Sequence, residues 1–299
     1  MSDSPAREEL RKILVAEQLP AMPQSALSVL KLENDLAKVN INDLVRPIET
    51  DPGLAAQVLK FLNSSAFGFQ SSISNIRQGI ALVGIRIVKN FVLWKAVFSL
   101  IPKSKSGTFD VAALWQDSLR RAMFARYLLM ELKCGDPEMT FAGALLQDMA
   151  IPLLLKLKQA EYSPVLDRLP KSGGKRLSQI ERETFGWDHA DAGYVLGQHW
   201  KLPELLTHLI SSHLEIDKVE EIYKQQPETA VVCLSAALPT VSSDIWEEQD
   251  VFKGHFSKLF PGNVRLASLL FDRVDREFES AAALMQIQSP KLPLFGYLD

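Results

Sequence analysis

The stretch Ile48-Glu49-Thr50-Asp51-Pro52-Gly53-Leu54-Ala55-Ala56-Gln57-Val58-Leu59 holds a complete helix start. The Asp51 side chain can accept a hydrogen bond from a free backbone N–H of the first turn, and Pro52 suits the first helical position, where no N–H is needed. Apolar residues then recur on one face of the same helix: Leu54, Val58, Leu59 and Leu62. We therefore expect an amphipathic helix from Gly53 to about Asn63.

The same kind of start signal recurs along the chain, whereas strand patterns are nearly absent. Asp136-Pro137 repeats the pair and predicts a helix over 138–157, which Pro152 interrupts because a proline inside a helix removes a backbone hydrogen bond. Further helices are expected near 228–238 and 263–287. The fold class predicted is all-α.

Two more start signals lie in the second half of the chain. Ser178 with Glu181 fits a capping box before a short helix, and Asp188 is placed to cap a helix that reaches about Trp200. Between the halves, the polar and small residues 103–107 predict a boundary. We expect two helical lobes, residues 1–108 and 109–299.

Composition limits the class of protein. Of 299 residues, only two are cysteine, which excludes a disulfide scaffold and suits a reducing cytoplasm. The N-terminus lacks a signal peptide, and the longest apolar stretches found, 91–101 and 230–238, are shorter than the roughly 20 residues that a membrane span needs. We expect a cytoplasmic protein that does not contact a membrane.

The net charge of −3 is unevenly distributed. Residues 1–108 hold 13 basic and 9 acidic residues, and the stretch 52–109 holds no acidic residue. Such a stretch could contact an acidic partner, and three of its lysines are candidates for that contact: Lys60, Lys103 and Lys105. The alternative is that these lysines are isolated, solvent-exposed side chains on otherwise apolar helices.

Several stretches of the sequence resemble catalytic or binding motifs without satisfying them. Residues 171–175 resemble a phosphate loop, but Leu169 stands where that loop needs a glycine. A helix-turn-helix over 76–92 would bury its second helix, so core packing is the better interpretation. All five histidines lie between His189 and His255, so any site with several histidine ligands belongs to the second lobe.

Four separated motifs now occur in a specific order: 19–23 (Leu-Pro-Ala-Met-Pro), 48–59 as quoted above, 63–68 (Asn-Ser-Ser-Ala-Phe-Gly) and 73–84 (Ile-Ser-Asn-Ile-Arg-Gln-Gly-Ile-Ala-Leu-Val-Gly). Together they resemble the HDOD domain, a non-catalytic relative of the HD and HD-GYP metal-dependent phosphohydrolases. The resemblance covers roughly residues 15–215. It implies an all-α fold whose second lobe is a degenerate HD-superfamily core.

The resemblance also implies where a hydrolase would bind metal. Asp117 stands at the position of the first histidine, and Gln147-Asp148 stands at the position of the His-Asp pair. His189 and His213 resemble the two later histidine segments. Only Asp148, His189 and His213 match, and the neutral amide of Gln147 is a poor replacement for imidazole at a transition metal. The five residues are therefore expected to line a vestigial pocket.

These departures favour a regulatory protein over an enzyme. We expect no catalytic residues, no cofactor and no stoichiometric metal; if a metal binds, its ligands would be Asp117, Asp148, His189 and His213. The expected partner is a protein of a signalling pathway, with a nucleotide as a second ligand to consider and nucleic acid not expected. The alternative is a metal-dependent HD-type phosphohydrolase that acts on a nucleotide or cyclic dinucleotide, with bound water activated by the metal.

Overall fold

The computed structural model describes residues 5–16, 19–30, 32, 40–64, 67–100, 109–263, 265–285 and 287–298. Within these ranges the chain forms helices and no β-strand, as predicted. The candidate contact residues Lys103 and Lys105 and the expected lobe boundary lie outside the described residues, whereas Lys60 is described and is exposed.

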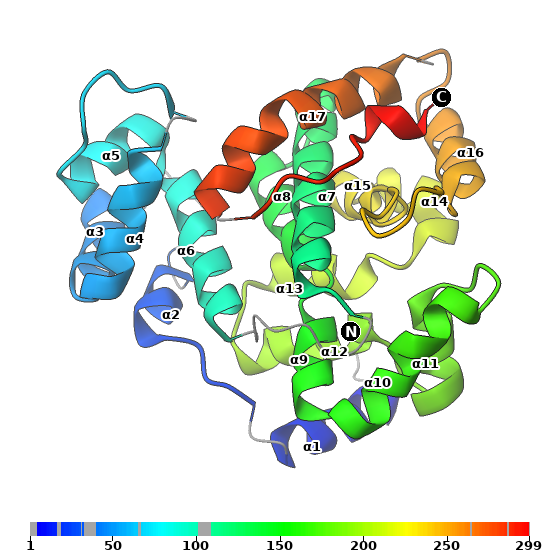
Figure 1. Cartoon of the computed structure of the whole chain (residues 1–299). Coiled ribbons are helices and arrows are strands. Elements are labelled where there is room, and N and C mark those ends of the chain that lie inside the picture. The colour runs from blue at the N-terminus through cyan, green and yellow to red at the C-terminus, as the bar shows by residue number, and fades with distance from the viewer. Residues whose placement is uncertain are drawn as a thin grey trace.

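Five helices of the N-terminal lobe surround an apolar core at one side of the molecule (Figure 1). They are α2 (Gln24–Leu30), α3 (Ile41–Glu49), α4 (Pro52–Leu62), α5 (Ile76–Val83) and α6 (Ile85–Leu100). The predicted cap of α4 is confirmed, because Asp51 Oδ1 accepts a hydrogen bond from the Leu54 N–H at 3.0 Å. Helix α6 buries seven of its sixteen residues, including Phe91 and Trp94, and its contacts with α8 join the two lobes.

The second lobe is built around the long helix α7 (Val111–Leu132), which stands at the centre of Figure 1. The helices that follow are α8 (Pro137–Leu146), α9 (Ala150–Leu157), α10 (Gln159–Arg168), α11 (Leu177–Phe185), α12 (His189–His199), α13 (Glu204–Ser212), α14 (Val219–Tyr223), α15 (Pro227–Ala236), α16 (Gln249–Leu259) and α17 (Leu266–Met285). Short 3₁₀ turns occur at Leu169–Lys171, Ile216–Lys218 and Phe295–Tyr297. Sequence periodicity did not predict α10, α14 or α16.

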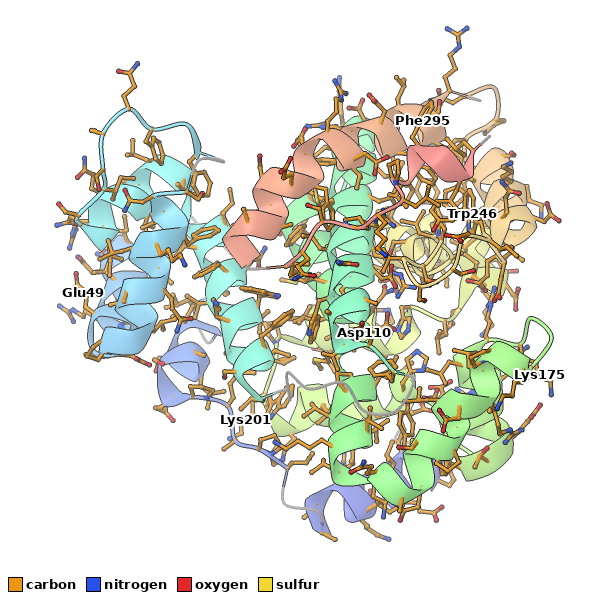
Figure 2. The ribbon with its side chains drawn as sticks, in the orientation of Figure 1. Glu49, Asp110, Lys175, Lys201, Trp246 and Phe295 are labelled. Atoms are coloured by element: carbon orange, nitrogen blue, oxygen red, sulfur yellow. The ribbon has the colours of Figure 1, made fainter. Side chains whose placement is uncertain are left out.

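Side chains fill the space between α7 and its neighbours (Figure 2). Trp246, for example, is buried and its ring lies 5.2 Å from that of Phe252 and 5.7 Å from that of Phe271. The run Pro137–Leu157 is long and apolar enough to cross a membrane by length and composition, but 89% of its apolar window is buried inside the protein. This run, which is longer than the apolar stretches 91–101 and 230–238, forms the core helices α8 and α9.

The helix predicted over 138–157 breaks at a different place from the one expected. Residues 147–149 form a turn between α8 and α9, while Pro152 lies inside α9. Pro152 is the third residue of α9, where a backbone N–H has no partner within the helix and its loss costs little. The true break places Gln147 and Asp148 at the end of α8.

One element of the N-terminal part lies against the second lobe. Helix α1 (Pro5–Ala16) packs on α12, with Leu10 and Leu14 fully buried. Arg7 Nε lies 2.8 Å from Asp191 Oδ1, and the Trp200 indole N–H donates to the Pro20 carbonyl at 2.8 Å. Helix α1 and Pro20 therefore lie against the second lobe, although they belong to the first 108 residues of the chain.

Candidate functional site

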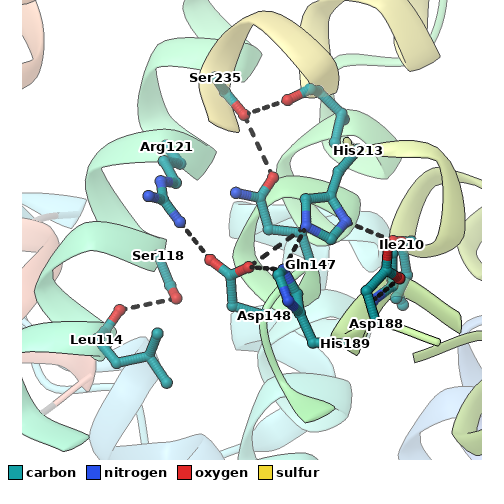
Figure 3. A network of polar contacts seen from close by, with 12 residues as sticks. Leu114, Ser118, Arg121, Gln147, Asp148, Asp188, His189, Ile210, His213 and Ser235 are labelled. Carbon is teal, nitrogen blue, oxygen red and sulfur yellow. Dashed lines mark hydrogen bonds and ion pairs between the residues drawn. The ribbon is translucent and has the colours of Figure 1, made fainter. Parts of the chain in front are cut away.

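Three of the predicted site residues converge at the centre of the second lobe (Figure 3). Asp148 comes from the turn after α8, His189 is the first residue of α12, and His213 follows α13. The Nε2 atoms of the two histidines are 3.2 Å apart. Asp148 Oδ1 lies 3.5 Å from His189 Nε2 and 3.4 Å from His213 Nε2.

The other nitrogen of each imidazole is fixed by the protein. His189 Nδ1 lies 2.6 Å from Glu181 Oε2, and the same oxygen accepts the His189 backbone N–H at 3.0 Å. His213 Nδ1 donates to the Ile210 carbonyl at 2.7 Å. Both Nε2 atoms therefore point towards Asp148, and a fixed second nitrogen is the arrangement that orients metal-binding histidines.

Glu181 is a site residue that sequence reasoning assigned to another role. Helix α11 begins at Leu177, and its first turn is closed by Gln179, whose Oε1 accepts the Arg176 backbone N–H at 3.0 Å. The expected capping box of Ser178 with Glu181 is therefore wrong. Glu181 is instead fully buried, and it also accepts a hydrogen bond from the Tyr162 hydroxyl. The one sequence signal for this role of Glu181 is its position eight residues before His189.

The charges in this cluster alter two pKa values. Burial lowers the pKa of His189, but the Glu181 carboxylate outweighs it and raises the value to about 9. Burial raises the pKa of Asp148, but the Arg121 guanidinium and His213 hold it well below its usual range. These shifts favour the imidazolium form of His189 and the carboxylate form of Asp148 at neutral pH.

Arg121, on α7, is a second residue that sequence reasoning missed. It forms an ion pair with Asp148 Oδ2, the oxygen that faces away from the histidines (Figure 3). Its side chain is 11% exposed. The signal that could have found it is its position four residues after Asp117, on the same face of the helix.

Asp117 and Gln147, at the two positions where a hydrolase would carry histidine, are not arranged as metal ligands. Asp117 Oδ1 accepts the Val241 backbone N–H at 2.8 Å, and burial raises the Asp117 pKa to about 6. Gln147 Oε1 lies 3.5 Å from the Ser235 hydroxyl, while its amide nitrogen is buried without a partner among the described residues. Asp117, which the sequence offers as a fourth ligand, therefore does not join the cluster of three donors.

A single metal ion fits the spacing of the three donors but not their charge. Bonds of about 2.0–2.2 Å in a tetrahedral site place neighbouring donors roughly 3.3–3.5 Å apart, as Asp148, His189 and His213 are placed. Arg121 already neutralises Asp148, however, and the raised pKa of His189 favours a protonated imidazole, which cannot ligate a metal. A second ion has no ligands here, because Asp148 Oδ2 is taken by Arg121 and Gln147 is not a base.

The model of the HDOD domain family matches residues 19–216. An uncharacterized protein of Treponema pallidum is 24% identical over 70% of this chain and 41% of its own length. The uncharacterized protein YuxH of Bacillus subtilis is 30% identical over 48% of this chain and 34% of its own length. The chain thus spans less than half the length of these two relatives.

Solved structures share the fold over nearly the whole chain. An HDOD domain protein of unknown function from Geobacter sulfurreducens has a TM-score of 0.73 and 22% identity, covering 96% of this chain and 99% of its own. A Shewanella amazonensis protein, provisionally named a phosphohydrolase, has a TM-score of 0.70 and 20% identity, covering 95% and 98%. With the family match over most of the sequence, these findings show that the chain belongs to the HDOD domain family.

Proposed function

We propose that this chain is a non-catalytic HDOD-type signal-transduction protein of the bacterial cytoplasm, which acts by binding a protein partner. The observation that carries the proposal is the ion pair between Arg121 and Asp148 in the pocket where a hydrolase would hold metal. A cation fixed on the chain neutralises Asp148 but cannot bind and acidify a water molecule as a metal does.

The burial of the pocket supports the same conclusion. Each of the five pocket residues is at most 6% exposed: Asp117, Gln147, Asp148, His189 and His213. A phosphodiester substrate must reach the reacting groups directly, and none of these side chains is presented to solvent. The cytoplasmic assignment rests on the low cysteine count, and the bacterial one on relatives from Treponema and Bacillus.

One observation favours the alternative, a metal-dependent phosphohydrolase acting on a nucleotide or cyclic dinucleotide. Asp148, His189 and His213 still converge, and they could hold one divalent ion. Such an ion would supply a Lewis acid beside the substrate phosphate. Gln147 and Arg121 weigh against it, because neither residue can ligate a metal as the histidine of an HD pair does.

Metal content and turnover separate the two functions. We expect purified protein, after dialysis, to hold well under one metal ion per chain and to hydrolyse a generic phosphodiester in Mn²⁺ no faster than the Asp148→Ala variant. Stoichiometric metal together with turnover that Asp148→Ala abolishes would make this protein an enzyme and refute the proposal.

The partner surface is tested separately. Of the basic residues in the stretch 52–109, Arg86 lies 3.3 Å from Asp136 and Lys89 donates to the Leu32 carbonyl, whereas Lys60 and Arg77 are exposed. We expect the triple charge reversal of Lys60, Lys103 and Lys105 to glutamate to weaken partner capture. Lys253→Glu, an exposed site on α16, is the matched control. Unchanged capture by the triple variant would exclude this surface.

A further inference from the structure

Two buried carboxyl groups lie near one arginine in the pocket. Asp117 and Arg121 are four residues apart on α7, so their side chains leave the same face of the helix. Arg121 reaches from there to Asp148, on the turn after α8. The exposed fractions of Asp117 and Asp148 are only 6% and 5%.

A buried carboxylate needs a cation or several hydrogen-bond donors to offset its lost hydration. Asp148 accepts from Arg121 and faces the two histidines, while Asp117 accepts one backbone N–H, from Val241. Arg121 lowers the pKa of both carboxyl groups, in opposition to burial. The neighbouring Arg120 donates to the Leu292 carbonyl, and its charge also lowers the pKa of Asp117, to a smaller extent than that of Arg121.

We propose that Arg121 is a resident cation that takes the place of a divalent metal ion beside Asp148, and that removing its guanidinium turns the pocket into a metal site. An ion would then bind the Asp148 carboxylate and the Nε2 atoms of His189 and His213, which are already 3.2–3.5 Å apart, and it would displace the proton of His189 as it binds. Imidazole and carboxylate ligands select a transition metal such as Zn²⁺ or Mn²⁺.

Three variants of the full chain distinguish the effect of the Arg121 charge from the effect of its side-chain shape. Arg121→Met removes the guanidinium but keeps much of its apolar stem. Arg121→Lys keeps a cation in the same place. Arg126→Met is the matched control, because Arg126 lies on the same helix and forms a 2.7 Å ion pair with Glu138, away from the pocket. Each protein is dialysed against Zn²⁺ or Mn²⁺ and then against metal-free buffer, and its metal is counted per chain.

We expect Arg121→Met to retain about one more ion per chain than the wild type, because Asp148 is then free of its ion pair and the metal can compete with the proton on His189. Its melting temperature should rise on addition of the metal, since a ligand that binds only the folded state stabilises it. Arg121→Lys and Arg126→Met should match the wild type in both measurements. Equal metal content in Arg121→Met and the wild type would overturn the proposal, as would equal gains in all three variants.

A failure of Arg121→Met to fold still decides the question. The denatured variant is then refolded by dilution with and without Zn²⁺ or Mn²⁺. Recovery that depends on the metal supports the proposal, and failure to recover in both buffers refutes it. The inference rests on the proposed absence of catalysis, but the two fail differently: turnover by the wild type would refute the function, whereas metal counts of the variants decide the role of Arg121.

Discussion

Asp117 carries a charge at a cost to the folded state. Burial raises its pKa from 3.8 to about 6, although Arg121 and the Val241 N–H act in the opposite direction. The folded protein therefore binds this proton more tightly than the unfolded chain does. Between these two pKa values the stability contributed by Asp117 falls as pH rises, and above about 6 the full cost is present.

The variant Asp117→Asn should remove this cost while its amide oxygen still accepts the Val241 N–H. At pH 7 we expect it to raise the free energy of unfolding by about 1–3 kcal/mol, since one pKa unit corresponds to about 1.4 kcal/mol. Urea unfolding of both proteins at a series of pH values measures the difference. It should be small near pH 4, grow through pH 6 and then level off; a difference independent of pH would show that Asp117 does not titrate as proposed.

The pocket residues show which parts of a site can be predicted from sequence. Asp148, His189 and His213 were found because they keep the residue types of the resembling family. Glu181 and Arg121 were missed because their roles depend on the packing of α11 and α7 against the pocket, which no local pattern encodes. Ser178 and Glu181 satisfy a capping pattern in sequence, but tertiary contacts with Tyr162 and His189 place Glu181 in the core.

Among the helices, the predictions that succeeded were local ones. Asp51, Asp136 and Asp188 each accept a backbone N–H within two or three residues, so the sequence alone contains both partners. The break after α8 was misplaced because it depends on where helices meet and not on proline. A helix of five residues such as α14 is too short to display a period.

Close packing of α12 and α13 fixes the distance between His189 and His213. A Cβ atom added at Gly193 of α12 would lie 2.6 Å from Ile210 Cγ2, and the Ile210 carbonyl holds His213. Gly193→Ala should therefore destabilise the protein by about 1–3 kcal/mol through overpacking, even though alanine favours a helix by about 1 kcal/mol.

Gly254 on α16 is the matched control for this substitution, because a Cβ added there meets no packed neighbour within 4 Å. Gly254→Ala should stabilise the protein by about 0.5–1 kcal/mol, the ordinary helix preference. Both effects are measured as shifts in the urea midpoint. If Gly193→Ala were also stabilising, α12 and α13 would be free to separate and the histidine spacing would not be fixed by their packing.

In the whole molecule, α1 connects the beginning of the chain to the helix that carries His189. Arg7 bonds Asp191 at 2.8 Å, and its guanidinium carbon lies 4.3 Å from the centre of the Tyr194 ring. Asp191 in turn lies 3.4 Å from Arg182, which also pairs with Asp188, the residue that caps α12. The same group of ion pairs therefore holds α1 in place and stabilises the start of α12.

We expect Arg7→Ala to loosen α1 and leave the core of the second lobe intact. Loss of a half-buried, charge-assisted hydrogen bond of about 1.4 kcal/mol should speed amide hydrogen exchange in Pro5–Ala16 by roughly ten-fold. Exchange in α7 should stay unchanged, because its packing does not depend on α1. Lys12→Ala is the control, since Lys12 is exposed on the same helix and lies 3.9 Å from Glu8. Equally faster exchange in α1 for both variants would mean that the contact of Arg7 with Asp191 is not what holds this segment in place.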